Sequence, residues 1–172
     1  CVVLNSKLWA IIAIVLLVGG FVGGYFTGSA VKPAAPTPEP IKVGVLLDLS
    51  GDLGPIGQRM KCGAELAAKQ INEQGGFNGR EVKLFIEDCE TDPNKAVEAV
   101  KKLVEVQGVK IIVGPMMSPE TLAMAKYVND REVVIISPSA TAAKISELGD
   151  DYVFRVVGSD KFQAEALIDL VK

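Results

Sequence analysis

The chain has 172 residues, with 18 Lys and Arg against 21 Asp and Glu, and it contains no histidine. A slightly acidic chain without a basic run is not expected to bind nucleic acid. The lack of histidine removes the commonest general base and the commonest metal ligand, and the three cysteines form no Cys-x-x-Cys pair. We therefore expect neither an enzyme nor a protein with a metal or cofactor.

The N-terminus carries an apolar segment, residues 8–26, that contains no charge. A helix of that length spans roughly 28 Å, close to the thickness of the hydrocarbon core of a bilayer. We expect residues 1–30 to form an uncleaved membrane anchor with Lys7 on the inner side; a long signal peptide cut near residue 30 is the alternative. Four prolines in the following segment, 31–40, predict a stiff, extended tether.

From residue 41 onward, strand and helix patterns alternate. Strands are predicted at 41–49, 81–88, 109–114, 133–137 and 152–157. Helices are predicted at 59–74, at 93–107 and at 160–172, the last two with Asp92 and Ser159 as N-caps. A further helix is predicted to begin at Pro119 with Ser118 as its N-cap. A short helix that ends at residue 148 is predicted to have Thr141 as its N-cap. This alternation predicts an α/β domain, a Rossmann-like parallel sheet with helices on both faces, over residues 41–172. Ligands bind such folds at the carboxyl ends of the strands.

Four of the loops at that edge carry a hydroxyl residue near the start of a helix, namely Ser50, Ser118, Thr141 and Ser159. Serine and threonine are good N-caps, and Ser159 is interpreted in that way alone. Ser118 and the run that ends at Thr141 differ, because two adjacent loops would present amides and hydroxyls at one place. The loops after the first, third and fourth predicted strands contain no lysine or arginine. Such an edge suits a small carboxylate or amide solute better than a phosphate.

Glycines at 51, 54 and 57 follow the first predicted strand with the spacing G-x-x-G-x-x-G. This spacing lacks the first glycine pair of a dinucleotide-binding loop. We interpret these glycines as positions where the backbone approaches a ligand or a neighbouring turn. The chain has no Gly-x-Ser-x-Gly elbow, and a Ser-His-Asp triad is excluded without histidine, so a hydrolase is disfavoured.

The acidic residues near the same edge are interpreted as structural. Asp48 is predicted to be a loop-ordering acceptor, and the acidic residues between 88 and 92 are predicted to serve turns and a helix cap. Cys62 and Cys89 are interpreted as buried free thiols, with a disulfide between them left open.

A series of short motifs runs through the domain in a characteristic order and spacing. In chain order they are Ile41-Lys42-Val43-Gly44 with Ser50-Gly51, Gly63-Ala64-Glu65, Ile71-Asn72 with Gly75-Gly76 and Gly79, Asp88 with Asp92-Pro93, Ala96-Val97, Val113-Gly114 with Ser118, Ser137-Pro138-Ser139-Ala140-Thr141-Ala142, Phe154-Arg155, and Asp160 with Gln163. Through these motifs, residues 41–172 resemble the N-terminal lobe of the leucine/isoleucine/valine-binding protein family, which has the type I periplasmic-binding fold.

The resemblance implies an extracytoplasmic receptor whose two lobes close on a small amino acid or amide and then dock on an ABC permease. Ser118 would hold the solute carboxylate, Thr141 would contact the carboxylate and the ammonium, and the carbonyl of Ser139 would accept from the ammonium. Ile56, with Met116 and its neighbour Met117, would line the side-chain pocket. The ligand-site residues assigned in this way are Ser118, Ser139, Ala140, Thr141, Ile56 and Met117.

The chain departs from the family pattern at two places. Some members carry a disulfide where this chain has Thr91 and Met117, so that bridge is absent here. The chain also stops at Lys172, where the family crosses to its second lobe, so we expect half a ligand site and very weak binding by residues 41–172 alone. The alternative function is a ligand-binding sensor domain of a membrane receptor or of an amide-responsive regulator, because the same fold serves both.

Overall fold

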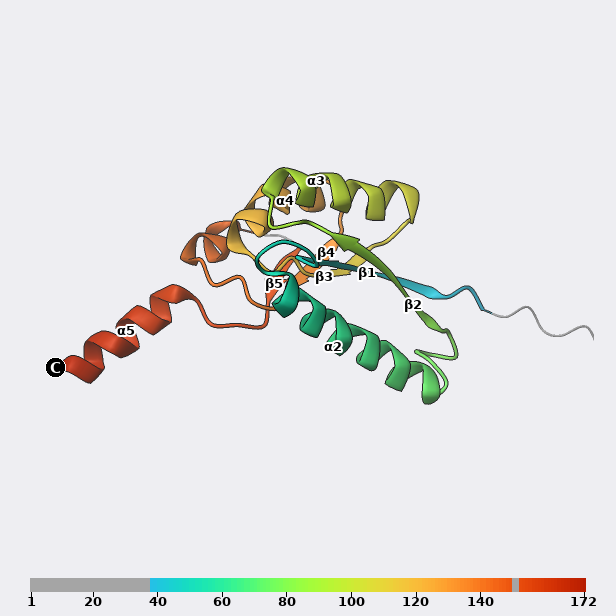
Figure 1. Cartoon of the computed structure of the whole chain (residues 1–172), viewed down its shortest axis with the longest axis horizontal. Helices are drawn as coiled ribbons and strands as arrows, with labels where there is room; N and C mark the ends of the chain where they lie inside the picture. Colours follow the sequence, from blue (N-terminus) through green and yellow to red (C-terminus); the bar gives the residue numbers. More distant parts are fainter. Residues whose placement is uncertain (1–37, 150–151) are drawn as a thin grey trace, which may run out of the picture. The chain divides into compact units, whose positions relative to one another are not determined.

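Five parallel strands form one sheet in the order β2-β1-β3-β4-β5. The computed structural model describes residues 38–149 and 152–172 (Figure 1). The strands are β1 (Ile41–Leu47), β2 (Val82–Asp88), β3 (Ile111–Val113), β4 (Val134–Ser137) and β5 (Val153–Arg155). The helices are α2 (Gly54–Glu73), α3 (Pro93–Lys101) continued by a π-helical stretch η1 (Lys102–Val106), α4 (Ser118–Asp130), a 3-10 helix η2 (Ala143–Glu147) and α5 (Asp160–Val171). The predicted parallel α/β sheet is confirmed.

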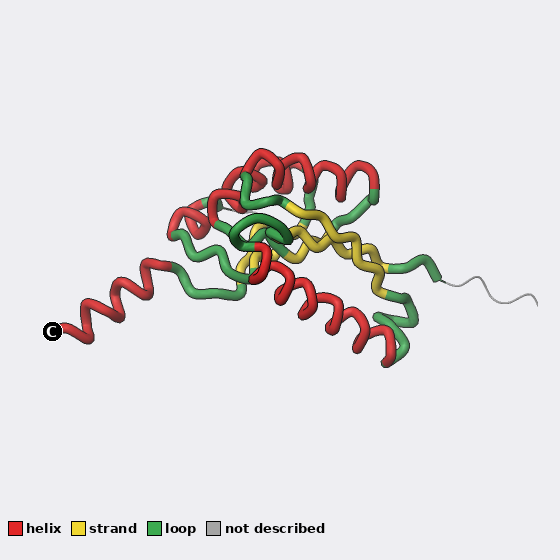
Figure 2. Tube along the Cα trace, in the orientation of Figure 1, coloured by secondary structure: helices red, strands yellow, loops and turns green. Residues whose placement is uncertain are grey.

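Helices cover both faces of the sheet, with α3 and α4 on one side and α2 on the other (Figure 2). Successive strand residues point to opposite faces. Leu46, Ile112 and Ile135 therefore join α3 and α4 in the larger core, whereas Val45 and Leu47 face α2 in a smaller one. The parallel register places the ends of β1, β3 and β4 at one edge, which brings the loops that follow them together.

The helix starts differ from the sequence prediction at three places. Helix α2 begins at Gly54 rather than at 59, since Pro55 supplies a preset helical φ in the first turn. Met117, not Ser118, is the N-cap of α4, and its extended backbone places Ser118 inside the first turn. Thr141 caps no helix, because η2 starts only at Ala143. The predicted caps Asp92 and Ser159 are confirmed, since both side chains accept from amides of the following turn.

Two glycines are required by close backbone contacts at the carboxyl edge. A Cβ atom on Gly57 would lie 1.8 Å from the carbonyl oxygen of Asp48, and one on Gly114 would lie 1.8 Å from that of Leu46. Gly114 also has a φ of +119°, which residues with a side chain rarely adopt. The prediction that the loop glycines approach a neighbouring turn is confirmed for Gly57, which seats the start of α2 against the end of β1.

The expected anchor at residues 1–30 lies outside the described residues, as does most of the tether, so both stay predictions. Among the helices that the structure describes, none combines the length and the apolar character needed to cross a bilayer.

Candidate functional site

The loops after β3 and β4 are held together through Ser118. Its hydroxyl oxygen accepts a hydrogen bond from the amide of Ala142 at 3.1 Å, instead of capping its own helix. Ala142 directly follows Thr141, so the first turn of α4 and the loop after β4 meet at the carboxyl edge of the sheet. The structure therefore brings together the two loops that the sequence predicted would converge there.

A second serine, Ser137, organises this contact from beneath. Its hydroxyl donates to the carbonyl of Pro115 at 2.6 Å and accepts from the amide of Ala140 at 3.0 Å. The hydroxyl of Ser139 donates to the carbonyl of Met116 at 2.8 Å, which adds a further link between the two loops. Ser137 was not predicted as a site residue, although it opens the run Ser137 to Ala142, one of the motifs that carry the family resemblance.

Thr141 keeps its amide and its hydroxyl unpaired within the part of the chain that the structure describes. Its carbonyl accepts from the amide of Asp160 at 2.9 Å. The carbonyl of Ser139 is likewise unused by any described residue, because only the hydroxyl and amide of Ser139 are engaged. The loop therefore offers an amide, a hydroxyl and a carbonyl to a ligand.

Arg155 at the end of β5 supports this loop from behind. Its guanidinium donates to the carbonyls of Ala142 at 2.9 Å and Ala140 at 3.4 Å, and it also contacts the hydroxyl of Ser146. Ala140 consequently has both of its backbone groups committed, since its amide donates to Ser137. Ala140 is buried and contributes loop geometry to the site rather than a free polar group.

The residues proposed to line the pocket differ in exposure. Ile56, in the first turn of α2, is 48 % exposed and Met117 is 37 % exposed, so both can contact a solute. Met116 is instead buried against Val45 and Leu47 in the core beneath α2. Of the two methionines named in the sequence analysis, only Met117 is accessible.

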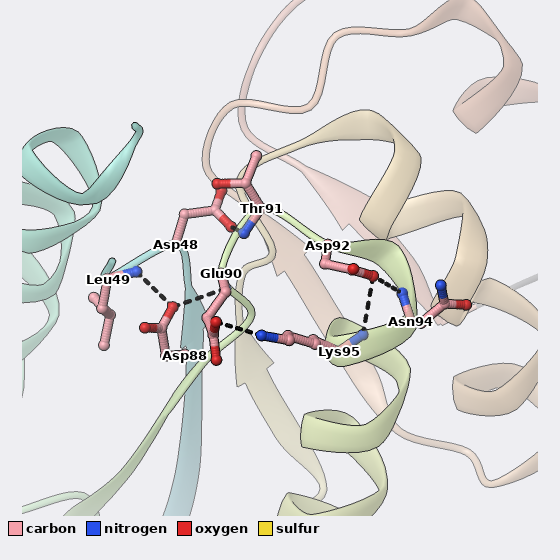
Figure 3. Close-up of polar contacts among 8 residues, drawn as sticks. All are labelled: Asp48, Leu49, Asp88, Glu90, Thr91, Asp92, Asn94 and Lys95. Carbon is pink, nitrogen blue, oxygen red and sulfur yellow. Dashed lines mark hydrogen bonds and ion pairs between the residues drawn. The ribbon is translucent and has the colours of Figure 1, made fainter. Parts of the chain in front are cut away.

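The acidic residues at the end of β2 and in the loop that follows serve turns and a helix cap, as predicted (Figure 3). Asp88 accepts from the amides of Leu49 at 2.8 Å and Glu90 at 2.9 Å. Asp92 caps α3 through the amides of residues 94 and 95, and Glu90 pairs with Lys95. Partial burial acts to raise the pKa of Asp88, but hydrogen bonds from the Ser50 hydroxyl and three backbone amides outweigh it and lower that pKa below its ordinary value.

The two described cysteines are free thiols but differ in burial. Cys62 is exposed on α2, so the prediction that it is buried is wrong; it lies on the outer face of the helix. Cys89 is fully buried, and its Sγ lies 3.1 Å from Oδ1 of Asp48 as a donor. Asp48 also accepts from the amide of Thr91 at 2.8 Å, which confirms its predicted role as a loop-ordering acceptor.

A large apolar groove of about 500 Å³ lies on the α2 face of the sheet. Pro138 in the loop after β4 lines it, but Ser118, Ser139 and Thr141 do not. Every residue that lines it is apolar, including Ile71 on α2 and Ile111 on β3. A groove without a donor cannot hold a carboxylate or an ammonium group, because each would lose its hydrogen bonds to water without replacement. The loops at the carboxyl edge, and not this groove, form the candidate site.

Comparison with known proteins places the domain in a family. The family described as periplasmic binding protein matches residues 40–172. An uncharacterized protein of Methanocaldococcus jannaschii is 40% identical over 140 residues, which cover 77% of this chain and 33% of that protein. The leucine-, isoleucine-, valine-, threonine- and alanine-binding protein of Pseudomonas aeruginosa is 35% identical over 125 residues, covering 73% of this chain and 33% of that protein. The chain thus spans about a third of the length of these relatives.

Solved structures agree with this grouping. The branched-chain amino acid transporter substrate-binding protein LivJ of Streptococcus pneumoniae, in complex with isoleucine, matches with a TM-score of 0.67 and 32% identity, over 70% of this chain and 34% of that chain. A substrate-binding protein of an ABC transporter from Desulfitobacterium hafniense, in complex with leucine, matches with a TM-score of 0.67 and 28% identity, over 77% and 38% of the two chains.

Proposed function

Because the chain belongs to the periplasmic binding protein family, we propose that residues 41–172 form one lobe of an extracytoplasmic solute-binding receptor of an ABC importer. The solute is a small amino acid of the branched-chain type. The lobe holds its α-carboxylate and α-ammonium groups at the carboxyl edge of the sheet, and the loaded receptor delivers it to the permease. The receptor binds and releases its solute without chemical change.

The observation that carries this proposal is the junction of Ser118 with the loop that contains Thr141. The hydroxyl of Ser118 accepts from Ala142, so its hydrogen remains available to a carboxylate. The amide and hydroxyl of Thr141 are unpaired among the described residues, and the N-terminus of α4 adds a favourable dipole for an anion. The carbonyl of Ser139 is free to accept from the ammonium group.

The charge of the loops favours an amino acid over a phosphate. Arg155 donates to the carbonyls of Ala140 and Ala142 and stands behind the loop. Neutral donors suffice for one carboxylate, whereas phosphate usually recruits a cation as well. Ile56 and Met117 supply apolar surface for a branched side chain. The solutes named for two of the relatives, isoleucine and leucine, have this chemistry.

The membrane is the proposed location of the receptor. On this proposal residues 1–30 anchor the chain, residues 31–40 keep the lobe away from the bilayer, and the permease is the protein partner. Fractionation of cells that express the whole chain, with protease added from outside, tests this: the domain should pellet with membranes and be cleaved in intact spheroplasts.

Binding is tested by NMR titration of the isotope-labelled 172-residue chain with leucine. One lobe offers half of the contacts, so we expect weak, millimolar-range binding, with amide shifts confined to Ser118 and residues 139–142. Leucinamide, which lacks the carboxylate, should cause much smaller shifts than 4-methylpentanoate, which keeps it. Shifts that map to the α2-face groove instead would refute the proposed site.

Substitutions at the two hydroxyl residues separate the site from general surface binding. Ser118→Ala and Thr141→Val each remove a donor to a charged group, which costs about 1.5–3 kcal/mol, or roughly tenfold or more in affinity. Ser50→Ala, at the same edge but outside the proposed site, serves as the control and should bind like the wild type. Equal binding by all three variants would contradict the proposal.

A further inference from the structure

Three titratable side chains meet in the core beneath the candidate site, and the proposed function uses none of them. They are Asp48 at the end of β1, Cys89 after β2 and Glu120 in the first turn of α4. All three are buried, with Asp48 0 % and Glu120 1 % exposed. One carboxylate oxygen from each acid and the sulfur of Cys89 lie within 4.8 Å of one another.

Two carboxylate oxygens of this cluster have no hydrogen-bond donor. Asp48 uses Oδ1 to accept from Cys89 and Thr91, and Glu120 uses Oε2 to accept from the amide of Met117 at 3.3 Å. The other oxygens, Oδ2 of Asp48 and Oε1 of Glu120, are buried without a partner. Two facing carboxylates in that position would be strongly unfavourable, whereas one proton between them would satisfy both oxygens.

No lysine or arginine of the described residues forms an ion pair with Asp48 or Glu120. Every lysine or arginine ion pair among the described residues involves other acids, and Arg155 donates to loop carbonyls. The β2–α3 loop meets the pair through the Cys89 thiol and the amide of Thr91. Its charged groups are engaged elsewhere, since Asp88 and Asp92 accept from backbone amides and Glu90 pairs with Lys95. Neutralisation must therefore come from within the cluster.

We propose that Asp48 and Glu120 share one proton at neutral pH, with Glu120 as its donor, and that this pair is a positioning device for the first turn of α4. The proton is placed on Glu120 because two donors already reach Oδ1 of Asp48, while Glu120 accepts one long hydrogen bond. The protonated Glu120 then spans from the end of β1 to the amide of Met117, next to Ser118. Burial, together with the hydrogen bond and the charge of Asp48, raises the pKa of Glu120 to about 8.

The sign of the pH dependence follows from that raised pKa. Below the ordinary pKa of 4.5 the group is protonated in both the folded and the unfolded chain, and its contribution to stability is complete. Between 4.5 and about 8 only the unfolded chain releases the proton, so stability falls as the pH rises, by about tenfold in the unfolding equilibrium constant per pH unit. Above that window the contribution stays lost.

The test measures urea unfolding of the whole chain from pH 5 to pH 9. The wild type should lose stability across this window. Glu120→Gln should match it at pH 5 and exceed it at pH 9, because the amide donates to Asp48 and accepts from Met117 at every pH. Asp48→Asn should reduce the slope, because the charge of Asp48 is removed while the burial of Glu120 remains. Glu147→Gln, at an exposed position, should keep the full slope. A wild type without the slope, or a Glu120→Gln variant that keeps it, would overturn the proposal.

Infrared spectroscopy at pH 7 tests the proton without unfolding. The wild type should show the C=O stretch of a protonated carboxylic acid, which Glu120→Gln should lack. Because neither experiment uses a ligand, the outcome is independent of the proposed solute. If the purified chain instead contains about one equivalent of a divalent metal whose removal by EDTA destabilises the wild type but not Glu120→Gln, the oxygens hold a cation and the shared proton is wrong.

Discussion

The two faces of the sheet are packed to different degrees. Beneath α3 and α4, strand residues such as Leu46 and Ile112 are fully buried, and they meet fully buried helix residues such as Leu103 and Val128. On the α2 face, the helix contacts β1 and β2, and an apolar groove remains in which Ile111 is 41 % exposed. The sheet carries apolar side chains on both faces, so the difference arises from which helices cover them and not from the strands.

Helices α4 and α5 also differ in how many of their side chains are buried. Helix α4 buries five residues against the sheet and its neighbours, whereas no residue of α5 is buried. The apolar side chains of α5, among them Phe162 and Leu170, are exposed. Stability should therefore be concentrated in the α3/α4 face, which is also the face that holds the first turn of α4 and Ser118.

The largest expected effect comes from truncation of that core. Ile112→Ala should lower the free energy of unfolding by about 2–5 kcal/mol, because it leaves a cavity in a fully buried position. Ile111→Ala, the same change one residue earlier, removes a side chain that faces the groove and should cost about 1 kcal/mol or less. Urea unfolding of both variants measures the contrast; equal losses would show that the two faces are packed alike.

A smaller effect is expected where α2 is seated on the end of β1. Gly57→Ala would bring a Cβ atom within 1.8 Å of the carbonyl of Asp48, which should cost about 1–3 kcal/mol. Gly63→Ala is the matched control in the same helix, since no atom lies near its Cβ position, and it should stabilise by up to about 1 kcal/mol. Thermal unfolding distinguishes the two; a neutral Gly57→Ala would mean that α2 moves freely on its face.

The smallest effect is expected at Asp88. Its carboxylate accepts from Leu49 in the loop before α2 and from Glu90 in the loop before α3, so it links the two loops. Its folded pKa is lowered, so its contribution is present above the ordinary pKa of 3.8 and is lost as the pH falls through the lower folded value. Asp88→Asn should cost about 1 kcal/mol at pH 7 and flatten the acid limb of the stability curve. Glu90→Gln, which breaks an exposed pair with Lys95, should change stability by roughly 0.5 kcal/mol or less.

Local sequence patterns predicted most of the fold. All five strands and the main helices appear near the expected positions, because strands in a parallel sheet are continuous apolar runs and because Asp92 and Ser159 are strong N-caps. The early start of α2 has a local cause in Pro55, but the error at Ser118 arises because a tertiary contact competes with a local one. Ser118 was predicted to cap its own helix, yet its hydroxyl accepts from Ala142, 24 residues away.

The supporting residues of the site were beyond sequence reasoning for the same reason. Ser137 and Arg155 have ordinary strand contexts, and only the pairing of β3, β4 and β5 brings them to the carbonyls of Pro115 and Ala142. Glu120 reads as an unremarkable acidic residue in a first helical turn. Its burial beside Asp48 depends on the packing of α4 against the loops after β1 and β2, which no local sequence pattern predicts.

By itself, the sequence determined the order of strands and helices along the chain, the absence of lysine and arginine from the loops after β1, β3 and β4, and the family. These depend on periodicity, composition and short motifs. Only the tertiary structure decided which hydroxyls are free, which carboxyls face each other and which side of the sheet is covered. These properties depend on groups that are distant along the chain and become neighbours through packing. Long-range contacts of that kind set burial, and burial sets both the hydrogen bonds and the pKa of Glu120.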